Sequence, residues 1–310
     1  MVEFFAVFST GHSIMAVVGM GFNVLLIYLA LFQSPRAIRS YATLIVNFAI
    51  TDFFACFFDM FVQQRIIPAG VSLGYMSTGF CKYFGPTPCY VGYSLLLHSL
   101  SHSLWSLFLS FSYRYYILYY PAPSRKTLTG VVFLIYLPSL LQWVSFLWAQ
   151  DDPKEIVEIL HEMYPDYNLT GYCVTGTKNI VSFYALYTIF YMTLPITPVY
   201  VCILILRKKI IARLSFQGVS ITKDTKNMHS QLLMALTYQA ILPGFYLLSA
   251  VSYGIGQLGI YNHAALEYFT FSCILFIPFL SPKIFRTPSV EPTETSITFN
   301  RYNSNNQPVG

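Results

Sequence analysis

Charged side chains are scarce in this chain. Of its 310 residues only 10% are Asp, Glu, Lys or Arg, whereas 55% are hydrophobic, 18% are aromatic, and the mean hydropathy is +0.54. Soluble domains carry about 25% charged residues, because a folded surface has to be hydrated. The composition therefore excludes a water-soluble globule and predicts an integral membrane protein.

The sequence also lacks the patterns that mark soluble enzymes. It has no Ser-His-Asp set at workable spacing, no phosphate-binding loop and no dinucleotide-binding glycine pattern. Its basic residues lie between apolar runs rather than in one cluster, so no nucleic-acid partner is expected. We expect a protein that is not an enzyme, with no catalytic residues, no cofactor and no metal.

What the sequence does contain is seven apolar segments, each near the roughly twenty residues that a helix needs to cross a bilayer. They cover about residues 8–32, 42–62, 89–116, 127–148, 179–206, 231–253 and 264–285. We predict an all-α fold, a seven-transmembrane helix bundle over residues 1–285. Residues 286–310 are rich in Thr, Ser, Asn and Pro and are predicted to form a disordered cytoplasmic tail.

The distribution of basic residues predicts the orientation of the bundle. Fourteen of the 18 Lys and Arg residues follow spans one, three, five and seven, and four lie on the opposite side. Positively charged segments stay in the cytoplasm, so the N-terminus is expected outside and the C-terminus inside. The tripeptide Asn168-Leu169-Thr170, a glycosylation acceptor, falls in an outer loop under this orientation.

Three of the six cysteines lie at the predicted outer face, where disulfides persist. Cys89 begins span three and Cys173 lies in the long outer loop before span five. We predict a disulfide between Cys89 and Cys173, with Cys81 as the alternative partner.

Asp52 lies about ten residues into span two, a depth at which an ionised side chain is costly. Asn23 is similarly deep in span one and is a candidate hydrogen-bond partner of Asp52. The pair is interpreted either as an ion or proton site or as a buried polar pin between helices.

His98 and His102 are spaced i,i+4, so both imidazoles leave one face of span three. They are candidates for ligand contact or for hydrogen bonds between helices. A zinc site would need a third ligand at matching depth, and Glu267 lies in the outer part of span seven. Our candidates for a mostly apolar ligand pocket are His98, His102, Tyr187, Tyr246 and Glu267. Tyr187 and Tyr246 belong to the aromatic spans five and six.

Several motifs occur in a familiar order and resemble the rhodopsin-like G-protein-coupled receptors. They are G-F-N-V around Asn23, N-F-A-I-T-D ending at Asp52, Cys89 at the head of span three, Tyr113-Arg114-Tyr115 at its foot, Pro198 and Pro243. The stretches V-Q-Q-R-I-I-P, S-F-S-Y-R-Y-Y, L-R-K-K-I-I-A-R-L and H-S-Q-L-L-M-A-L-T-Y-Q-A-I-L-P resemble, more closely, the nematode chemosensory serpentine receptors of class delta.

The resemblance implies a multi-pass receptor in the plasma membrane of ciliated sensory endings. It implies a small-molecule or pheromone ligand, a role in smell or chemical sensing, and a heterotrimeric G protein as cytoplasmic partner. The coupling residues would be Arg114 and the basic run Arg207, Lys208 and Lys209. Tyr113 replaces the acid that precedes the arginine in most rhodopsin-like receptors. The alternatives are a ligand-gated channel or transporter and a metal-dependent membrane hydrolase.

Overall fold

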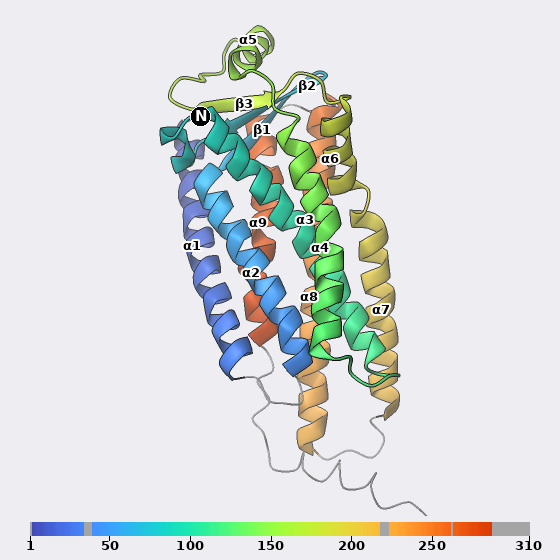
Figure 1. The fold of residues 1–310 in the computed structure, drawn as a ribbon. Coiled ribbons are helices and arrows are strands. Elements are labelled where there is room, and N and C mark those ends of the chain that lie inside the picture. The colour runs from blue at the N-terminus through green and yellow to red at the C-terminus, as the bar shows by residue number, and fades with distance from the viewer. Residues whose placement is uncertain (1, 34–38, 218–222, 262, 287–310) are drawn as a thin grey trace, which may run out of the picture.

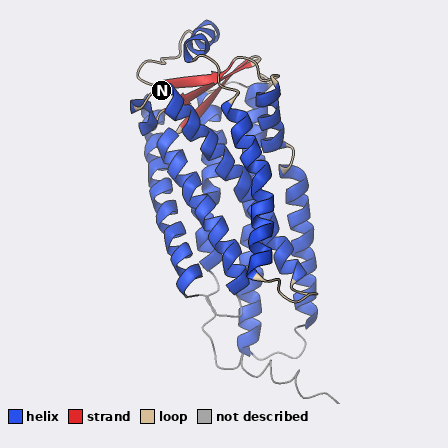
Figure 2. Cartoon of the chain, in the orientation of Figure 1, coloured by secondary structure: helices blue, strands red, loops and turns tan. Residues whose placement is uncertain are grey.

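Long helices run side by side in one bundle, and a small sheet covers one end of it, in a computed structural model that describes residues 2–33, 39–217, 223–261 and 263–286 (Figures 1 and 2). The long helices are α1 (Val2–Phe32), α2 (Arg39–Val62), α3 (Pro86–Tyr116), α4 (Arg125–Leu147), α7 (Ile196–Gln217), α8 (Lys223–Gln257) and α9 (Ala264–Arg286). The predicted all-α membrane bundle is confirmed. We call the end with the sheet the outer end.

Length and apolar composition alone identify five membrane spans among the described residues: Phe8–Phe32, Ser40–Val62, Arg125–Leu147, Phe183–Arg213 and Ala265–Pro282. The other two expected spans, α3 and α8, carry more polar side chains. Helix α3 packs against α2, α4 and α7, and most of its serines and both its histidines are buried. Polar side chains are tolerated in a membrane where neighbouring helices, rather than lipid, surround them.

Span five is two helices rather than one. Helix α6 (Phe183–Thr193) ends before Leu194 and Pro195, and α7 begins at Ile196. Proline has no backbone N–H to donate and its ring clashes with the preceding turn, so the helix breaks there. The single helix expected over residues 179–206 is therefore two helices in the structure.

The outer end carries a three-stranded antiparallel sheet that the sequence analysis did not predict. Its strands are β1 (Gln64–Ala69), β2 (Ser72–Ser77) and β3 (Cys173–Thr177), in the order β1-β2-β3. The first two form a hairpin directly after α2, and β3 joins from the loop before α6. The sheet lies across the outer end of the helices, at the same end as the N-terminus (Figure 1).

The short helix α5 (Pro153–Met163) covers the outer side of this sheet (Figure 1). It buries Ile156 and Leu160, each 1% exposed, and in water each such burial stabilises by about 1.5–3 kcal/mol. The packing is close: a Cβ on Gly74 would lie 2.6 Å from a Leu160 methyl group. A Cβ on Gly176 would lie 2.2 Å from the Leu73 carbonyl oxygen. Position 176 therefore requires glycine, whereas a side chain at position 74 would displace the end of the Leu160 side chain.

The predicted disulfide between Cys89 and Cys173 is wrong, because Cys89 is bonded to Cys81. Cys81 lies in a 3₁₀ turn, η2 (Phe80–Tyr83), between β2 and α3, and Gly85 reverses the chain with φ of 97°. This turn brings the two Cα atoms to 5.1 Å, within the usual range for a disulfide. Cys173 is held in β3 opposite Ser77 and is a buried free thiol.

Helix α9 extends to Arg286, so span seven is a full 23 residues long. The tail predicted for residues 286–310 lies, apart from Arg286, outside the described residues.

Candidate functional site

An apolar cavity lies under the sheet, between the outer halves of the helices. It leaves about 100 Å³ of free space. Its walls come from α3, α4, α6, α7, α8 and α9, and β1 and β2 contribute Ile66, Leu73 and Tyr75. None of the lining residues is Asp, Glu, Lys, Arg or His. The cavity is therefore suited to an uncharged, mainly apolar small molecule.

Aromatic rings pack tightly around this cavity. The ring centroid of Tyr75 lies 4.9 Å from that of Tyr93 and 5.9 Å from that of Phe146. Tyr93 also meets Phe271 of α9 edge to face at 5.8 Å. Rings at these separations attract one another, which fixes the shape of the wall.

Tyr246 is the one residue among our five ligand candidates that lines the cavity, and its hydroxyl donates a 2.7 Å hydrogen bond to the Leu100 carbonyl oxygen. Tyr187 lies on α6 but stacks with Phe183 and Tyr191. Tyr187 therefore lies in the expected span, but no sequence pattern indicates which face of α6 meets the cavity.

The two histidines share one face of α3, as predicted, but that face packs on α4 and α2 instead of the cavity. His98 contacts the Ser139 carbonyl oxygen at 2.8 Å and the Tyr136 hydroxyl at 2.9 Å, both in α4. His102 lies 3.3 Å from the Asn47 side-chain oxygen in α2. Among the described residues no three His, Cys, Asp or Glu side chains come together as a metal site requires.

Glu267 joins the outer sheet to α9 beside the cavity. Its carboxylate pairs with the Arg65 guanidinium of β1 and accepts a 2.9 Å hydrogen bond from the Tyr167 hydroxyl. Burial lowers the pKa of Arg65, but the charge of Glu267, its hydrogen bond and the neighbouring tyrosines together outweigh burial, so the pKa is raised. Burial, followed by the same carboxylate, raises the pKa of Tyr167 to about 12, so this hydroxyl stays a donor.

Glu267 and His263 border a smaller pocket of about 20 Å³ that shares Ile66, Tyr253 and Thr270 with the main cavity. Glu267 is thus next to the cavity without lining it. It acts in the structure as an anchor for the sheet that forms the cavity roof.

Asp52 is fully buried and ties three helices together. Its carboxylate accepts from the Ser103 hydroxyl of α3 at 2.8 Å and from the Ser281 hydroxyl of α9. Asn23 does not reach Asp52 through its amide nitrogen, which donates to the Gly19 and Pro278 carbonyl oxygens at 2.9 and 3.1 Å. These contacts are those expected of a polar pin between α2, α3 and α9.

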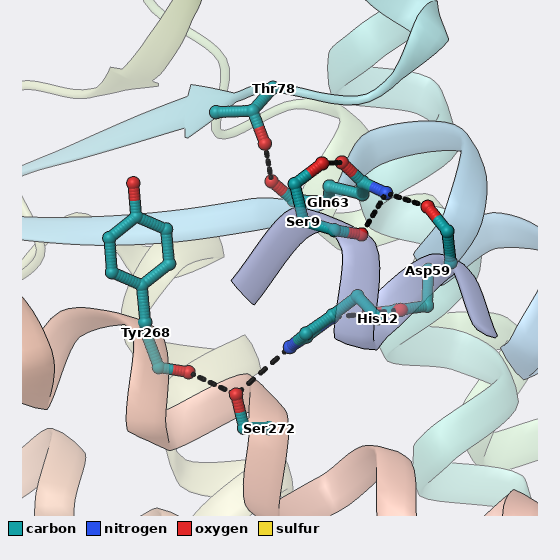
Figure 3. Close-up of polar contacts among 8 residues, drawn as sticks. Ser9, His12, Asp59, Gln63, Thr78, Tyr268 and Ser272 are labelled. Atoms are coloured by element: carbon teal, nitrogen blue, oxygen red, sulfur yellow. Dashed lines mark hydrogen bonds and ion pairs between the residues drawn. The ribbon is translucent and has the colours of Figure 1, made fainter. Parts of the chain in front are cut away.

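A second polar cluster, nearer the outer end, was not predicted (Figure 3). His12 of α1 contacts the Asp59 carboxylate of α2 at 3.0 Å and the Ser272 hydroxyl of α9 at 2.9 Å. Ser9 donates to the Gln63 side-chain oxygen at 2.7 Å. The one signal in the sequence was Asp59, which lies seven residues after Asp52 and so near the same helix face.

Comparison with known proteins places these features in one family. Residues 8–286 match the sequence profile of the serpentine-type seven-transmembrane chemoreceptor family Srd. This chain belongs to the Srd chemoreceptors.

Relatives of this Srd chain occur in Caenorhabditis elegans. It is 44% identical to serpentine receptor class delta-19 over 288 residues, which is 91% of this chain and 84% of the relative. It is 42% identical to class delta-18 with the same coverage. Class delta-1 is 33% identical over 86% of this chain and 73% of the relative. The class delta resemblance drawn from the motifs is confirmed.

The inner end of this Srd chain is organised around Arg114. Its guanidinium donates to the Gln239 side-chain oxygen of α8 and to the Tyr41 hydroxyl of α2. Tyr113, in the place of an acid, is buried and stacks on the Tyr41 ring at 5.6 Å. A neutral amide therefore takes the place of a carboxylate as the partner of the arginine.

The basic run on α7 of the Srd chain has a mixed environment. Arg207 donates a 2.9 Å hydrogen bond to the Thr237 hydroxyl of α8, and Lys208 is exposed. The Lys209 ammonium lies over the Tyr115 ring, 5.7 Å from its centroid. Asn168, the predicted glycosylation acceptor, is exposed in the loop before β3.

Proposed function

We propose that this Srd chemoreceptor binds a small, mainly apolar organic molecule in the cavity under the sheet and signals through a heterotrimeric G protein. The observation that carries the proposal is the cavity itself, which is apolar, free of charge and roofed by β1 and β2. An apolar cavity with a few polar groups is the usual form of a small-molecule site.

Helix α8 supports a route from the cavity to the inner end. Tyr246, in the cavity wall, bonds to α3 through the Leu100 carbonyl, and Gln239 bonds to α3 through Arg114. The two contacts are seven residues apart, about 10 Å along the helix axis. Pro243 lies between them and interrupts the backbone hydrogen bonding of α8. A ligand that shifts Tyr246 would thus change the tilt of the segment that holds Arg114.

Arg114 is the proposed contact for the G protein, with Arg207, Lys208 and Lys209 as a basic rim on the neighbouring helix. We expect the receptor in the plasma membrane of chemosensory endings, where an external ligand reaches its outer end. The family assignment supports both proposals, because its members are described as chemoreceptors of the G-protein-coupled type.

The test is nucleotide exchange on a purified G protein by the receptor in lipid nanodiscs, screened with uncharged organic compounds. Ala250→Phe should abolish the response of an active compound, because Ala250 lines the cavity and the ring would fill it. Val251→Phe is the matched control: it adds a ring at the next residue of α8, on a side chain that is 53% exposed.

A compound that evokes an ionic current without G protein, and no nucleotide exchange, would contradict the proposal in favour of a channel. Equal responses from Ala250→Phe and Val251→Phe at equal receptor concentration would show that the ligand binds elsewhere. Arg114→Ala should abolish exchange while it changes ligand affinity by no more than about threefold, because the two ends are far apart.

A further inference from the structure

Two hydroxyl groups in the cavity wall have no hydrogen-bond partner among the described residues. They belong to Thr188 of α6 and Tyr253 of α8, and both oxygens are buried. Among the other hydroxyls in the wall, that of Tyr246 donates to the Leu100 carbonyl oxygen, and that of Thr193 donates to the Ile189 carbonyl oxygen at 2.7 Å. The Thr270 hydroxyl lies 2.9 Å from the Ser252 hydroxyl. Thr188 and Tyr253 are the lining residues whose buried hydroxyl oxygens lack a partner in the described structure.

A buried polar group without a partner destabilises a folded protein, and most such groups are satisfied. Each of these hydroxyls has a hydrogen that it can donate. A carbonyl oxygen has two lone pairs and can accept from two donors at once. A ligand with one carbonyl group matches the pair, whereas a pure hydrocarbon leaves both hydroxyls unsatisfied.

Charge narrows the class of ligand further. No ionisable acid or base other than tyrosine lines the cavity, so an ammonium or carboxylate ligand would lose its hydration without a counter-ion. The free space of about 100 Å³ also sets the size. For comparison, an engineered cavity of about 150 Å³ in another protein binds benzene.

We infer that the ligand is an uncharged carbonyl compound, a ketone, aldehyde or ester of small size, whose oxygen accepts hydrogen bonds from Thr188 and Tyr253. The inference rests on the proposed ligand site in this cavity. It makes these two residues the determinants of ligand specificity. Because Thr188 lies on α6 and Tyr253 on α8, the carbonyl oxygen would also bridge these two helices.

The test compares butanone with 2-methyl-1-butene, which has nearly the same shape with CH₂ in place of the oxygen. Equilibrium binding is measured by ligand-observed NMR on the full chain in nanodiscs, with empty nanodiscs as the blank for partition into lipid. Propanoate and sec-butylammonium serve as the charged probes. The variants are Thr188→Val and Tyr253→Phe, which remove each hydroxyl with little change in shape.

Two matched control variants remove unpaired buried hydroxyls from positions that do not line the cavity. Thr43→Val does so on α2 and Tyr191→Phe on α6. Unlike Thr188→Val, Thr188→Ser keeps the hydroxyl and should bind the ketone about as tightly as the unmodified receptor does. It also provides a second reading if one of the other variants fails to fold.

Butanone should bind saturably, and each cavity variant should weaken its binding by about tenfold. The same variants should bind 2-methyl-1-butene as tightly as the unmodified receptor does, or more tightly, because an unpaired hydroxyl has been removed. The control variants should change the affinity for neither neutral probe, and the charged probes should bind more weakly than butanone.

The inference is overturned if the cavity variants affect both neutral probes alike, or if a charged probe binds more tightly than the ketone. Saturable hydrocarbon binding that these variants leave unchanged would keep the cavity as a ligand site while removing the carbonyl assignment. If no probe binds saturably, the carbonyl assignment fails. The proposed function fails separately, through the response of Ala250→Phe.

Discussion

The hydrogen bond from Arg114 to Gln239 is expected to hold the inner ends of α3 and α8 together. Gln239→Leu removes it while keeping a side chain of similar size. A hydrogen bond to a charged group contributes about 1.5–3 kcal/mol, and every 1.4 kcal/mol is a factor of ten. We call the receptor closed when the inner ends of α3 and α8 are held together and open when they are apart. The ratio of open to closed receptor should therefore rise by about ten- to a hundredfold. A receptor that is open in about 1% of molecules would then be open in about 10–50%.

The opposite change is Gln239→Glu, which gives Arg114 a buried carboxylate and so a charge-assisted hydrogen bond. It should lower ligand-independent activity below that of the unmodified receptor. Tyr113→Asp also adds an acid beside Arg114, but it removes a ring that stacks on Tyr41 and is therefore less clean. Thr237→Val is the matched control, because it breaks the Arg207 contact to α8 two residues away from Gln239.

Two measurements test the effect of the Gln239 variants. The first is basal nucleotide exchange on the G protein, which should increase with Gln239→Leu and decrease with Gln239→Glu. The second needs no G protein: the distance between spin labels on Tyr116→Cys and Tyr238→Cys, at exposed positions of α3 and α8, with the exposed Cys202 replaced. The longer distance should gain population in Gln239→Leu. Unchanged distances and unchanged exchange would refute the closing role of this bond.

Three further predictions concern the outer end. Cys81→Ser should reduce surface delivery, whereas Cys173→Ser should not, and surface labelling of intact cells checks this; the reverse result would restore the pairing through Cys173. Glu267→Ala should destabilise the receptor by about 3–5 kcal/mol because it leaves the Arg65 charge buried and unpaired. Adding Arg65→Leu should recover part of that loss in a thermal unfolding assay. Equal unfolding temperatures for the single and double variants would argue against the ion pair. Asn168 should carry glycan in a native-like membrane, and treatment with a glycosidase should increase the mobility of the receptor on a gel. A gel mobility that the glycosidase leaves unchanged would contradict the outward orientation.

Hydropathy predicted the helices because the need for an apolar surface in lipid acts on each segment alone. The bounds agree within a few residues for most spans, for example α4, predicted at 127–148 and found at Arg125–Leu147. Pro195 is evident in the sequence, but the break between α6 and α7 at this residue was not predicted. Proline is tolerated in many membrane helices, so the residue by itself does not predict a break.

The outer sheet could not be predicted in the same way. Strand β3 pairs with β2 across about a hundred residues, as in the match of Ser77 with Cys173. Each strand has five or six residues, and β2 is buried on both faces, so it shows no alternation of polar and apolar residues. The same pairing fixes Cys173 in the sheet and leaves Cys89 to its local partner. The wrong disulfide prediction was thus a consequence of the missing sheet.

The candidate site shows the same division between what a helix specifies and what its neighbours decide. The i,i+4 spacing of His98 and His102 correctly placed both on one face of α3, but no pattern within α3 indicates which helix that face meets. The cavity is assembled from residues on eight elements, and no element contributes more than four of them. Thr188 and Tyr253 stand out because they line the cavity and their buried hydroxyls have no partner in the described structure. Since pairing depends on all surrounding chains, the residues that we expect to recognise the ligand are those least visible in the sequence.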